Sequence, residues 1–299
     1  MLPIIALQTL YGASVPISKF LLSLCTPIYF SGIRMFLAGS VLIVGKIWYN
    51  SKKFIIKKEH LWLYVQTALF GIYFKYILRN WGLVSLPAVK MVFLLNSTPF
   101  IAALFSYISF KEVYTKKQWV GLLIGFAGLV PILILKAPAE QTTIQIFSLS
   151  LPELAIFAAV VCHTYGMISA RKLIREHGNS SVMVNGVRMF LGGFFALLTG
   201  MFFEGLFPIS NAPLFAGWLL VLIIVSNVIC HSLYMRLLKW YSVTFLSFSD
   251  FLSPFATAFY SWLFLKETIS WHYFASGLIV FIGLFLFYQD ELRQVNGQM

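Results

Sequence analysis

One carboxylate, Asp250, lies well inside an apolar segment of the sequence, between Phe248 and Phe251. An acid at the centre of a lipid bilayer costs about 2.5–3.5 kcal/mol on insertion scales, so such a group should face water, a cation or a cavity. We therefore expect Asp250 to bind a cationic substrate or to carry a coupling proton. A structural ion pair with Arg34 or Arg188 is the alternative that the sequence leaves open.

Two prolines, Pro99 and Pro254, stand in the middle of apolar segments, 155 positions apart. Proline removes a backbone donor and kinks a helix, which frees carbonyl oxygens that a ligand could use. Asn96 lies within one turn of Pro99, and Asp250 lies about one turn from Pro254. Helices that are interrupted at matching points of two halves indicate the binding site of a transporter. Kinks closed by neighbouring helices are the alternative.

Four basic residues also lie inside apolar segments: Arg34, Arg188, Lys75 and Lys90. Each arginine is about two turns from the nearer end of its segment, where it could snorkel or cap helix carbonyls. We expect a structural role for both arginines, with gating or carboxylate binding as the alternative. The lysines could attract a carboxylate or a phosphate at the mouth of a cavity, or they could snorkel.

Histidine and aromatic side chains complete the set of candidate residues. His163 and His231 lie in two further apolar segments and could titrate near neutral pH, although a histidine with satisfied hydrogen bonds is the simpler interpretation. Tyr11 belongs to a large aromatic set, of which a few members could stack on a flat or cationic ligand. The sequence has no phosphate-binding loop, zinc-ligand spacing or nucleophile elbow. We therefore expect no metal, no cofactor and no catalytic residue.

Membrane helices must position these residues. Of the 299 residues, 60% are apolar or aromatic and 11% are charged, and the mean hydropathy is +0.85. Soluble proteins have about 25% charged residues, so a water-soluble domain is excluded. A membrane helix needs about 20 mostly apolar residues. Windows of this length predict ten spans, at 3–22, 27–48, 61–79, 86–109, 118–136, 152–171, 182–203, 213–235, 243–264 and 271–289.

The net charge of +12 follows from membrane topology and does not indicate a nucleic-acid partner. With the N-terminus inside, fourteen Lys and Arg residues fall on the cytoplasmic side, four fall on the outer side and four lie within spans. Cytoplasmic connections carry the excess of positive charge, so both termini are predicted to be cytoplasmic. The chain then consists of a first unit at 1–136, an outer linker at 137–151 and a second unit at 152–299.

The two units resemble each other in sequence. Residues 32–39 read GIRMFLAG and residues 186–193 read GVRMFLGG, with six of eight positions identical at an offset of 154. Three further matches occur in the same order at an offset of 155. A unit of five spans is odd in number, so consecutive copies must insert in opposite orientations. The sequence therefore predicts an all-α fold of two inverted five-helix repeats, a design used by secondary transporters.

Glycines in several spans have the spacing that lets helices approach closely. Gly192 and Gly193 are adjacent in one span, and glycines occupy positions 121, 125 and 128 of another. Small residues at this spacing allow close contact between helix backbones. We expect these glycines to serve helix packing and not phosphate binding.

The repeat, the arginines of spans two and seven, and the Pro-Phe and Lys-Glu pairs of spans four and nine together resemble the EamA-type branch of the drug/metabolite transporter superfamily. The resemblance covers nearly the whole chain. It implies a ten-helix transporter with a central cavity that moves small organic metabolites without nucleotide hydrolysis. Around residues 11–14 (YGAS), the chain also resembles the S-adenosylmethionine/S-adenosylhomocysteine transporters of intracellular bacteria.

These observations predict a secondary transporter of the inner membrane, which works by alternating access on a small-molecule substrate within the lipid bilayer. The single acid would suit the sulfonium of S-adenosylmethionine, the two lysines would suit its carboxylate, and aromatic residues would suit its adenine. S-Adenosylhomocysteine would be the exchange partner. An exporter of amino acids or related metabolites is the main alternative. A lipid scramblase, which would need a polar groove open to lipid, is a more remote alternative. An intramembrane enzyme is also remote, because no paired catalytic groups share one depth.

Overall fold

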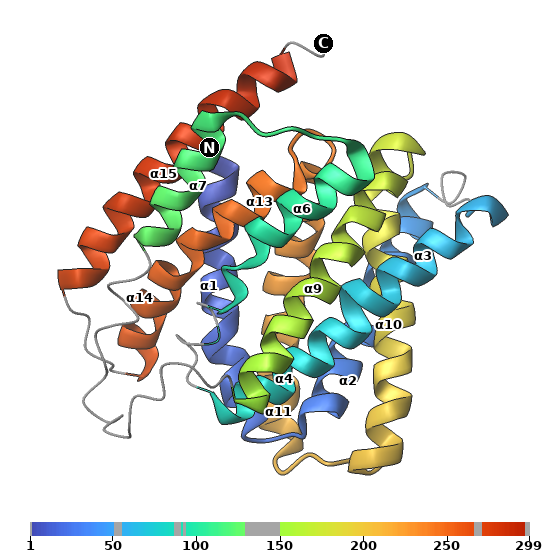
Figure 1. Ribbon diagram of the computed structural model, residues 1–299. Helices are drawn as coiled ribbons and strands as arrows, with labels where there is room; N and C mark the ends of the chain where they lie inside the picture. The colour runs from blue at the N-terminus through green and yellow to red at the C-terminus, as the bar shows by residue number, and fades with distance from the viewer. Residues whose placement is uncertain are drawn as a thin grey trace.

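The computed structural model describes residues 2–50, 56–86, 91, 94–128, 150–265 and 271–296. Within these residues the regular structure is helical, and the long helices form a bundle (Figure 1). The first half contains α1 (Leu2–Leu22), α2 (Pro27–Asn50), η2 (Lys58–His60), α3 (Leu61–Ala68), η3 (Leu69–Phe74), α4 (Lys75–Ser85), α6 (Thr98–Phe110) and α7 (Lys116–Ala127). The second half contains α9 (Leu151–Arg171), η4 (Lys172–Glu176), α10 (Ser181–Glu204), α11 (Ala212–Leu222), η5 (Ile223–His231), α12 (Ser232–Leu237), α13 (Val243–Ser249), η6 (Asp250–Leu252), α14 (Ser253–Leu265) and α15 (Trp271–Asn296).

Six helices in the described part of the chain are long and apolar enough to cross a membrane. They are Pro3–Leu22, Pro27–Trp48, Lys58–Ser85, Leu151–Glu176, Ser181–Glu204 and Ala212–Leu237. They coincide with six predicted spans, which confirms the prediction of an all-helical membrane protein. Thr98–Phe110 and Gly277–Asp290 are shorter apolar helices within two more predicted spans. The count of ten stays a prediction, because 87–90, 129–149 and 266–270 lie outside the described residues, as does most of the predicted linker.

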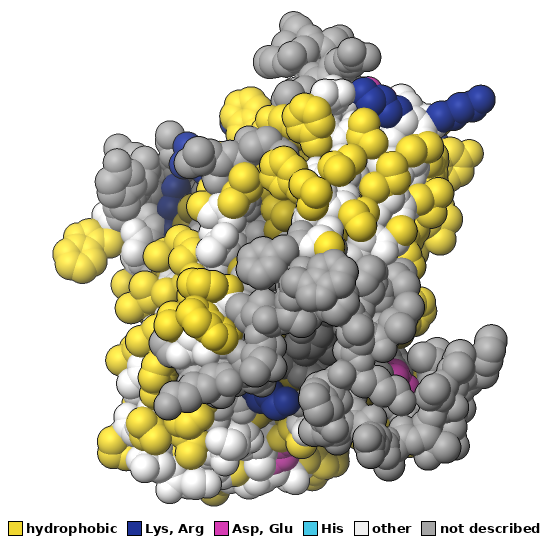
Figure 2. Space-filling model, turned by 90° about the vertical axis from the view of Figure 1, so that its left-hand side faces the viewer, with side chains coloured by type: hydrophobic (Ala, Val, Ile, Leu, Met, Phe, Trp, Pro, Cys, Tyr) yellow, Lys and Arg dark blue, Asp and Glu magenta, His cyan; other side chains and the backbone are white. Residues whose placement is uncertain are grey.

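The outside of the bundle is apolar. Val44, Trp62, Leu104 and Phe202 are large hydrophobic residues that are 56–83% exposed. Figure 2 shows hydrophobic side chains over much of the described surface on one face of the molecule. An exposed apolar surface of this extent fits contact with lipid.

Glycines bring helices of the two halves into close contact. The main pairs between halves are α2 with α10 and α7 with α15. A Cβ atom added to Gly193 would collide with the backbone of Phe36. A Cβ atom added to Gly121 would lie 2.7 Å from the carbonyl oxygen of Gly283. These contacts confirm the prediction that the glycines serve helix packing.

Both prolines lie in the first turn of a helix. Pro99 lies in the first turn of α6, which follows a turn at Asn96 and Ser97. Pro254 is the second residue of α14, which follows the 3₁₀ turn Asp250–Leu252. The two predicted spans are therefore interrupted near Pro99 and Pro254. The prediction of kinks within one helix is wrong, because each proline lies at the start of a new helix. The first turn of a helix tolerates proline because the N–H that proline lacks would have no partner there.

Three of the membrane helices contain π-helical segments: η3, η4 and η5. Of these, η3 begins at Leu69 and η5 at Ile223, which are 154 positions apart, the offset of the sequence repeat. Widened turns of this kind occur frequently at functional sites. Here Lys75 directly follows η3, and His231 ends η5.

Candidate binding site

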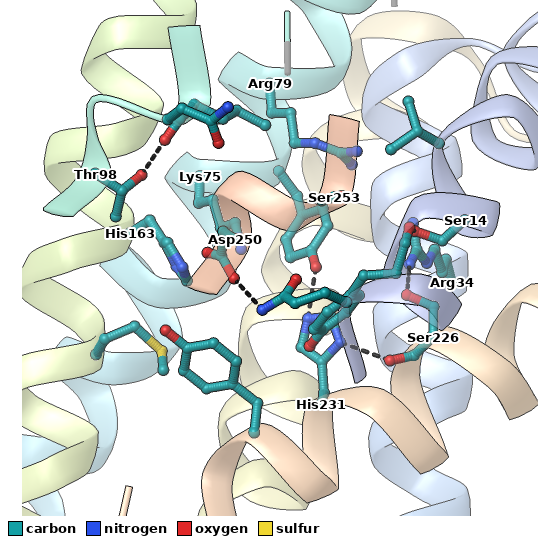
Figure 3. A pocket seen from close by; sticks show the side chains of 18 of the residues that line it. Ser14, Arg34, Lys75, Arg79, Thr98, His163, Ser226, His231, Asp250 and Ser253 are labelled. Carbon is teal, nitrogen blue, oxygen red and sulfur yellow. Dashed lines mark hydrogen bonds between the residues drawn. The ribbon is translucent and has the colours of Figure 1, made fainter. Parts of the chain in front are cut away.

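A cavity of about 130 Å³ lies between the two halves of the chain (Figure 3). This volume has room for several water molecules or part of an organic ligand. Its walls come from α1, α2, α4, α9, α10, η5, α12 and the starts of α6 and α14. The lining residues are Gln8, Tyr11, Ser14, Val15, Arg34, Lys75, Tyr76, Arg79, Leu95, Asn96, Thr98, His163, Met167, Arg188, Ser226, His231, Tyr234, Asp250 and Ser253.

Asp250 is held by a neutral partner. Its Oδ1 accepts a hydrogen bond of 2.7 Å from Nε2 of Gln8, and the same nitrogen donates to Oγ of Ser249 at 2.8 Å. These bonds join α1 to the junction between α13 and α14. Within the described chain, no basic side chain lies within ion-pair distance of Asp250, and the hydrogen bonds of Arg34 and Arg188 go elsewhere. The carboxylate therefore remains available to a ligand.

Lys75 and Arg79 lie one turn apart on α4 and face the same cavity. The Lys75 ammonium lies 4.8 Å from the centre of the Tyr76 ring, which is a cation–π contact. The described residues give that ammonium no hydrogen-bond or ion-pair partner. Arg79 donates a long hydrogen bond of 3.4 Å to Asn80. The predicted span 61–79 ends at Arg79, but α4 continues to Ser85, and this arginine is 7% exposed and lies on the cavity wall.

Arg34 is fully engaged by the protein. Its Nε donates to Asn227 at 2.9 Å, Nη2 donates to Ser226 at 2.8 Å and Nη1 donates to Ser18 at 3.3 Å. The guanidinium thus ties α2 to α1 and to the π-helical segment η5. The structural role of Arg34 stays a prediction, for which these hydrogen bonds give a physical basis.

Arg188 has weaker partners. Its Nε donates to Asn185 at 3.2 Å, and Nη1 lies 3.4 Å from the sulfur of Met167. A thioether is a weak acceptor. The guanidinium of Arg188 therefore has more capacity to bind a ligand than that of Arg34.

A tyrosine–histidine network forms another part of the wall. His231 Nδ1 lies 2.7 Å from the carbonyl oxygen of Ser226, so this nitrogen carries the hydrogen. Nε2 then accepts from the Tyr76 hydroxyl at 2.7 Å. The ring of Tyr11 packs edge-on against His231, with 5.3 Å between ring centres. These contacts hold the rings of Tyr11, Tyr76 and His231 in the wall of the cavity that the charged residues also line.

Four buried polar atoms of the cavity residues have no hydrogen-bond partner in the described structure. They are Oε1 of Gln8, Nδ2 of Asn96, Nδ1 of His163 and the hydroxyl of Tyr234. Burying a polar group without a hydrogen bond costs about 1–3 kcal/mol in proteins. Such groups fit a site that a ligand or water completes.

The structure brings together most of the predicted site residues. Asp250, Asn96, Lys75, Tyr11, His163, Arg34 and Arg188 all line the cavity. Pro99 and Pro254 do not line it, but each follows a residue that does. Lys90 lies outside the described residues. No group of three potential metal ligands occurs among the described residues.

Sequence reasoning did not assign Gln8, Tyr76, Arg79 or Ser226 to the site, and it placed Tyr234 only in the large aromatic set. Helical spacing carried a signal for two of them, because Gln8 lies three residues before Tyr11 and Arg79 lies four residues after Lys75. Residues at these spacings share one face of a helix. The remaining three depend on which helices become neighbours.

The fold and the cavity define a membrane transporter built from helices, and comparisons with known proteins agree. The EamA-like transporter family matches residues 1–134 and 150–289. The chain belongs to this family, which confirms the resemblance and makes it a multi-pass membrane transporter. The name of the family and the names of relatives at 31% identity are those of transporters.

Two relatives share one name. The S-adenosylmethionine/S-adenosylhomocysteine transporter of Chlamydia muridarum (strain MoPn / Nigg) is 31% identical over 95% of this chain and 90% of the relative. The protein of the same name from Chlamydia trachomatis serovar D is also 31% identical, over 95% of this chain and 88% of the relative. A solved crystal structure at 15% identity covers 97% of each chain with a TM-score of 0.76, which shows the same fold.

Proposed function

We propose that the chain is a secondary transporter that exchanges S-adenosylmethionine for S-adenosylhomocysteine across a bacterial inner membrane. The observation that carries the proposal is Asp250, a carboxylate inside the bundle that lines the cavity with a neutral partner and no paired cation among the described residues. The names of relatives at 31% identity over nearly the whole chain support this substrate.

The chemistry of the cavity suits the proposed substrate. S-Adenosylmethionine combines a flat adenine, a sulfonium cation, an ammonium group and a carboxylate. The cavity offers one acid, several basic groups and the rings of Tyr11, Tyr76 and Tyr234. Tyrosine faces attract cations and stack on flat rings, which makes them suitable for both the sulfonium and the adenine.

Alternating access between two inverted halves would provide the mechanism. The family matches two segments of similar length, 1–134 and 150–289. Equivalent features of the two halves also meet in space, since α2 packs on α10, and α7 on α15. A cavity between two such halves would open to one side or the other as they rock. Exchange then follows if the empty carrier changes orientation slowly.

Counterflow in proteoliposomes tests the function directly. Vesicles loaded with unlabelled S-adenosylhomocysteine should accumulate labelled S-adenosylmethionine several-fold above empty vesicles. Vesicles loaded with a mixture of amino acids serve as a matched arm and would reveal an amino-acid exporter. Accumulation that is no greater in S-adenosylhomocysteine-loaded vesicles than in empty ones would refute the proposal.

A further inference from the structure

Lys75 and Asp250 are opposite charges that line one cavity without forming an ion pair. Asp250 Oδ1 accepts from Gln8 at 2.7 Å, and the Lys75 ammonium rests 4.8 Å from the centre of the Tyr76 ring. Both residues line the cavity, and Figure 3 shows their labelled side chains on the same side of it. Both side chains are partly buried. A carboxylate and an ammonium in this position would ordinarily pair, because charges buried in a membrane protein are costly when alone.

We propose that Lys75 and Asp250 together bind the α-amino acid group of the substrate. Lys75 takes the α-carboxylate and Asp250 takes the α-ammonium. The inference rests on the proposed function, because it assumes a substrate with an amino acid group. It differs from the simplest assignment, in which the single acid would neutralise the sulfonium.

Hydrogen bonding favours the ammonium over the sulfonium as the partner of Asp250. A carboxylate has about four acceptor positions, and Gln8 fills one of them. An ammonium offers three N–H donors, whereas a sulfonium has none to offer. Hydrogen bonds between charged partners are also roughly twice as strong as neutral ones. A carboxylate inside the bundle is therefore satisfied better by an ammonium.

Lys75 and Asp250 have opposite charges and line one cavity, as recognition of an amino acid group requires. The ammonium and the carboxylate of an α-amino acid are attached to the same carbon, so their partners must be neighbours of opposite charge. The three arginines of the wall have more partners than Lys75: Arg34 has three hydrogen bonds to the protein, Arg188 has two, and Arg79 has one long hydrogen bond to Asn80. Lys75 has only its ring contact among the described residues.

Exchange gives an independent reason for this assignment. S-Adenosylmethionine and S-adenosylhomocysteine share the amino acid group and the adenosine, and they differ only in the methyl group that makes the sulfur cationic. A carrier that exchanges them must bind both. An acid that recognised the sulfonium would discriminate against one of the two, whereas an acid that recognises the ammonium binds both alike.

Binding measurements on the purified full chain distinguish the two assignments. The probes are S-adenosylmethionine, S-adenosylhomocysteine and methylthioadenosine, which lacks the amino acid group. Asp250→Asn and Lys75→Met should each weaken binding of the first two probes by about ten- to a hundredfold, and by equal factors. Methylthioadenosine should bind each variant as it binds the wild type. Decarboxylated S-adenosylmethionine should respond to Asp250→Asn but not to Lys75→Met.

Matched controls come from a charged pair outside the cavity. Lys117 and Asp290 are 3.7 Å apart, and neither lines the cavity. Lys117→Met and Asp290→Asn should leave the affinity for all the probes unchanged. If Asp250→Asn weakens S-adenosylmethionine alone, the acid binds the sulfonium and the proposal is wrong. An equal loss for methylthioadenosine would assign Asp250 to the shape of the cavity and would also overturn it. If the wild type binds no probe, the proposed function itself fails.

Discussion

Arg34 and Arg188 occupy corresponding positions of the sequence repeat, but their guanidinium groups are bound differently. Arg34 uses three nitrogens on side chains of α1 and η5, whereas Arg188 has one amide partner and the sulfur of Met167. Both arginines are 2% exposed. The hydrogen bonds of Arg34 therefore join helices of the protein, whereas Arg188 has more capacity to bind a ligand in the cavity.

This difference predicts unequal losses of stability. Arg34→Met removes three hydrogen bonds and leaves buried polar partners behind, which should cost about 3–5 kcal/mol. Arg188→Met removes one ordinary bond and one weak bond and should cost about 1–3 kcal/mol. Thermal unfolding of the two variants in the same detergent measures the difference. Equal melting temperatures for the two variants would contradict the distinction between them.

At the site, the sequence predicted the charged residues better than their partners. Asp250 and Lys75 were found because a charge inside an apolar span needs a reason to be there. Gln8 was missed, and Tyr234 could not be separated from the large aromatic set, because amides and tyrosines are unremarkable in such spans. Their importance arises only when α1 and α12 are placed beside the start of α14. The predicted span 61–79 ends six residues before the end of α4, so Arg79 was not among the predicted site residues.

At the scale of helices, contacts between backbones fix the arrangement of the two halves. The pair α2 and α10 is packed through glycines, and Gly193 lies against the backbone of Phe36. Small residues at a given spacing predict such contacts from sequence. The π-helical segments were not predicted, since apolar periodicity cannot separate a helix with 3.6 residues per turn from one with a local insertion.

Two glycine substitutions test the packing of these helices. Gly193→Ala should destabilise the protein by about 1–3 kcal/mol, because the new Cβ atom would collide with the backbone of Phe36. Gly45→Ala is the matched control, since a Cβ atom there would meet nothing within 4 Å. This second change should be neutral or stabilise by up to about 1 kcal/mol through helix propensity. If both variants unfold at the wild-type temperature, the close contact does not support the fold.

At the scale of the whole molecule, one end of the bundle has an ion pair and a hydrogen bond that join the two halves. The first residues of α1 and the last residues of α15 lie at this end (Figure 1). Arg171 forms an ion pair of 2.6 Å with Glu112, and the hydroxyls of Tyr114 and Thr244 are 2.7 Å apart. Arg171 is the last residue of the predicted span 152–171, and it is 2% exposed. It therefore joins α9 to the residues after α6.

The distribution of charge predicts that this end faces the cytoplasm. Cysteines introduced at Glu176, near this end, and at Ser210, between α10 and α11, should react differently with a membrane-impermeant maleimide. Both residues are exposed, so accessibility depends on the side of the membrane. In intact cells Ser210→Cys should be labelled and Glu176→Cys should not, whereas both should be labelled after the membrane is opened.

The parent chain is the control, because Cys25 and Cys230 are buried and Cys162 is only partly exposed. A reversed pattern would place both termini outside. Labelling of both sites in intact cells would mean that the connections after η4 and after α10 share one side. Such a result would be incompatible with α10 crossing the membrane once, and it would overturn the inverted repeat on which alternating access depends.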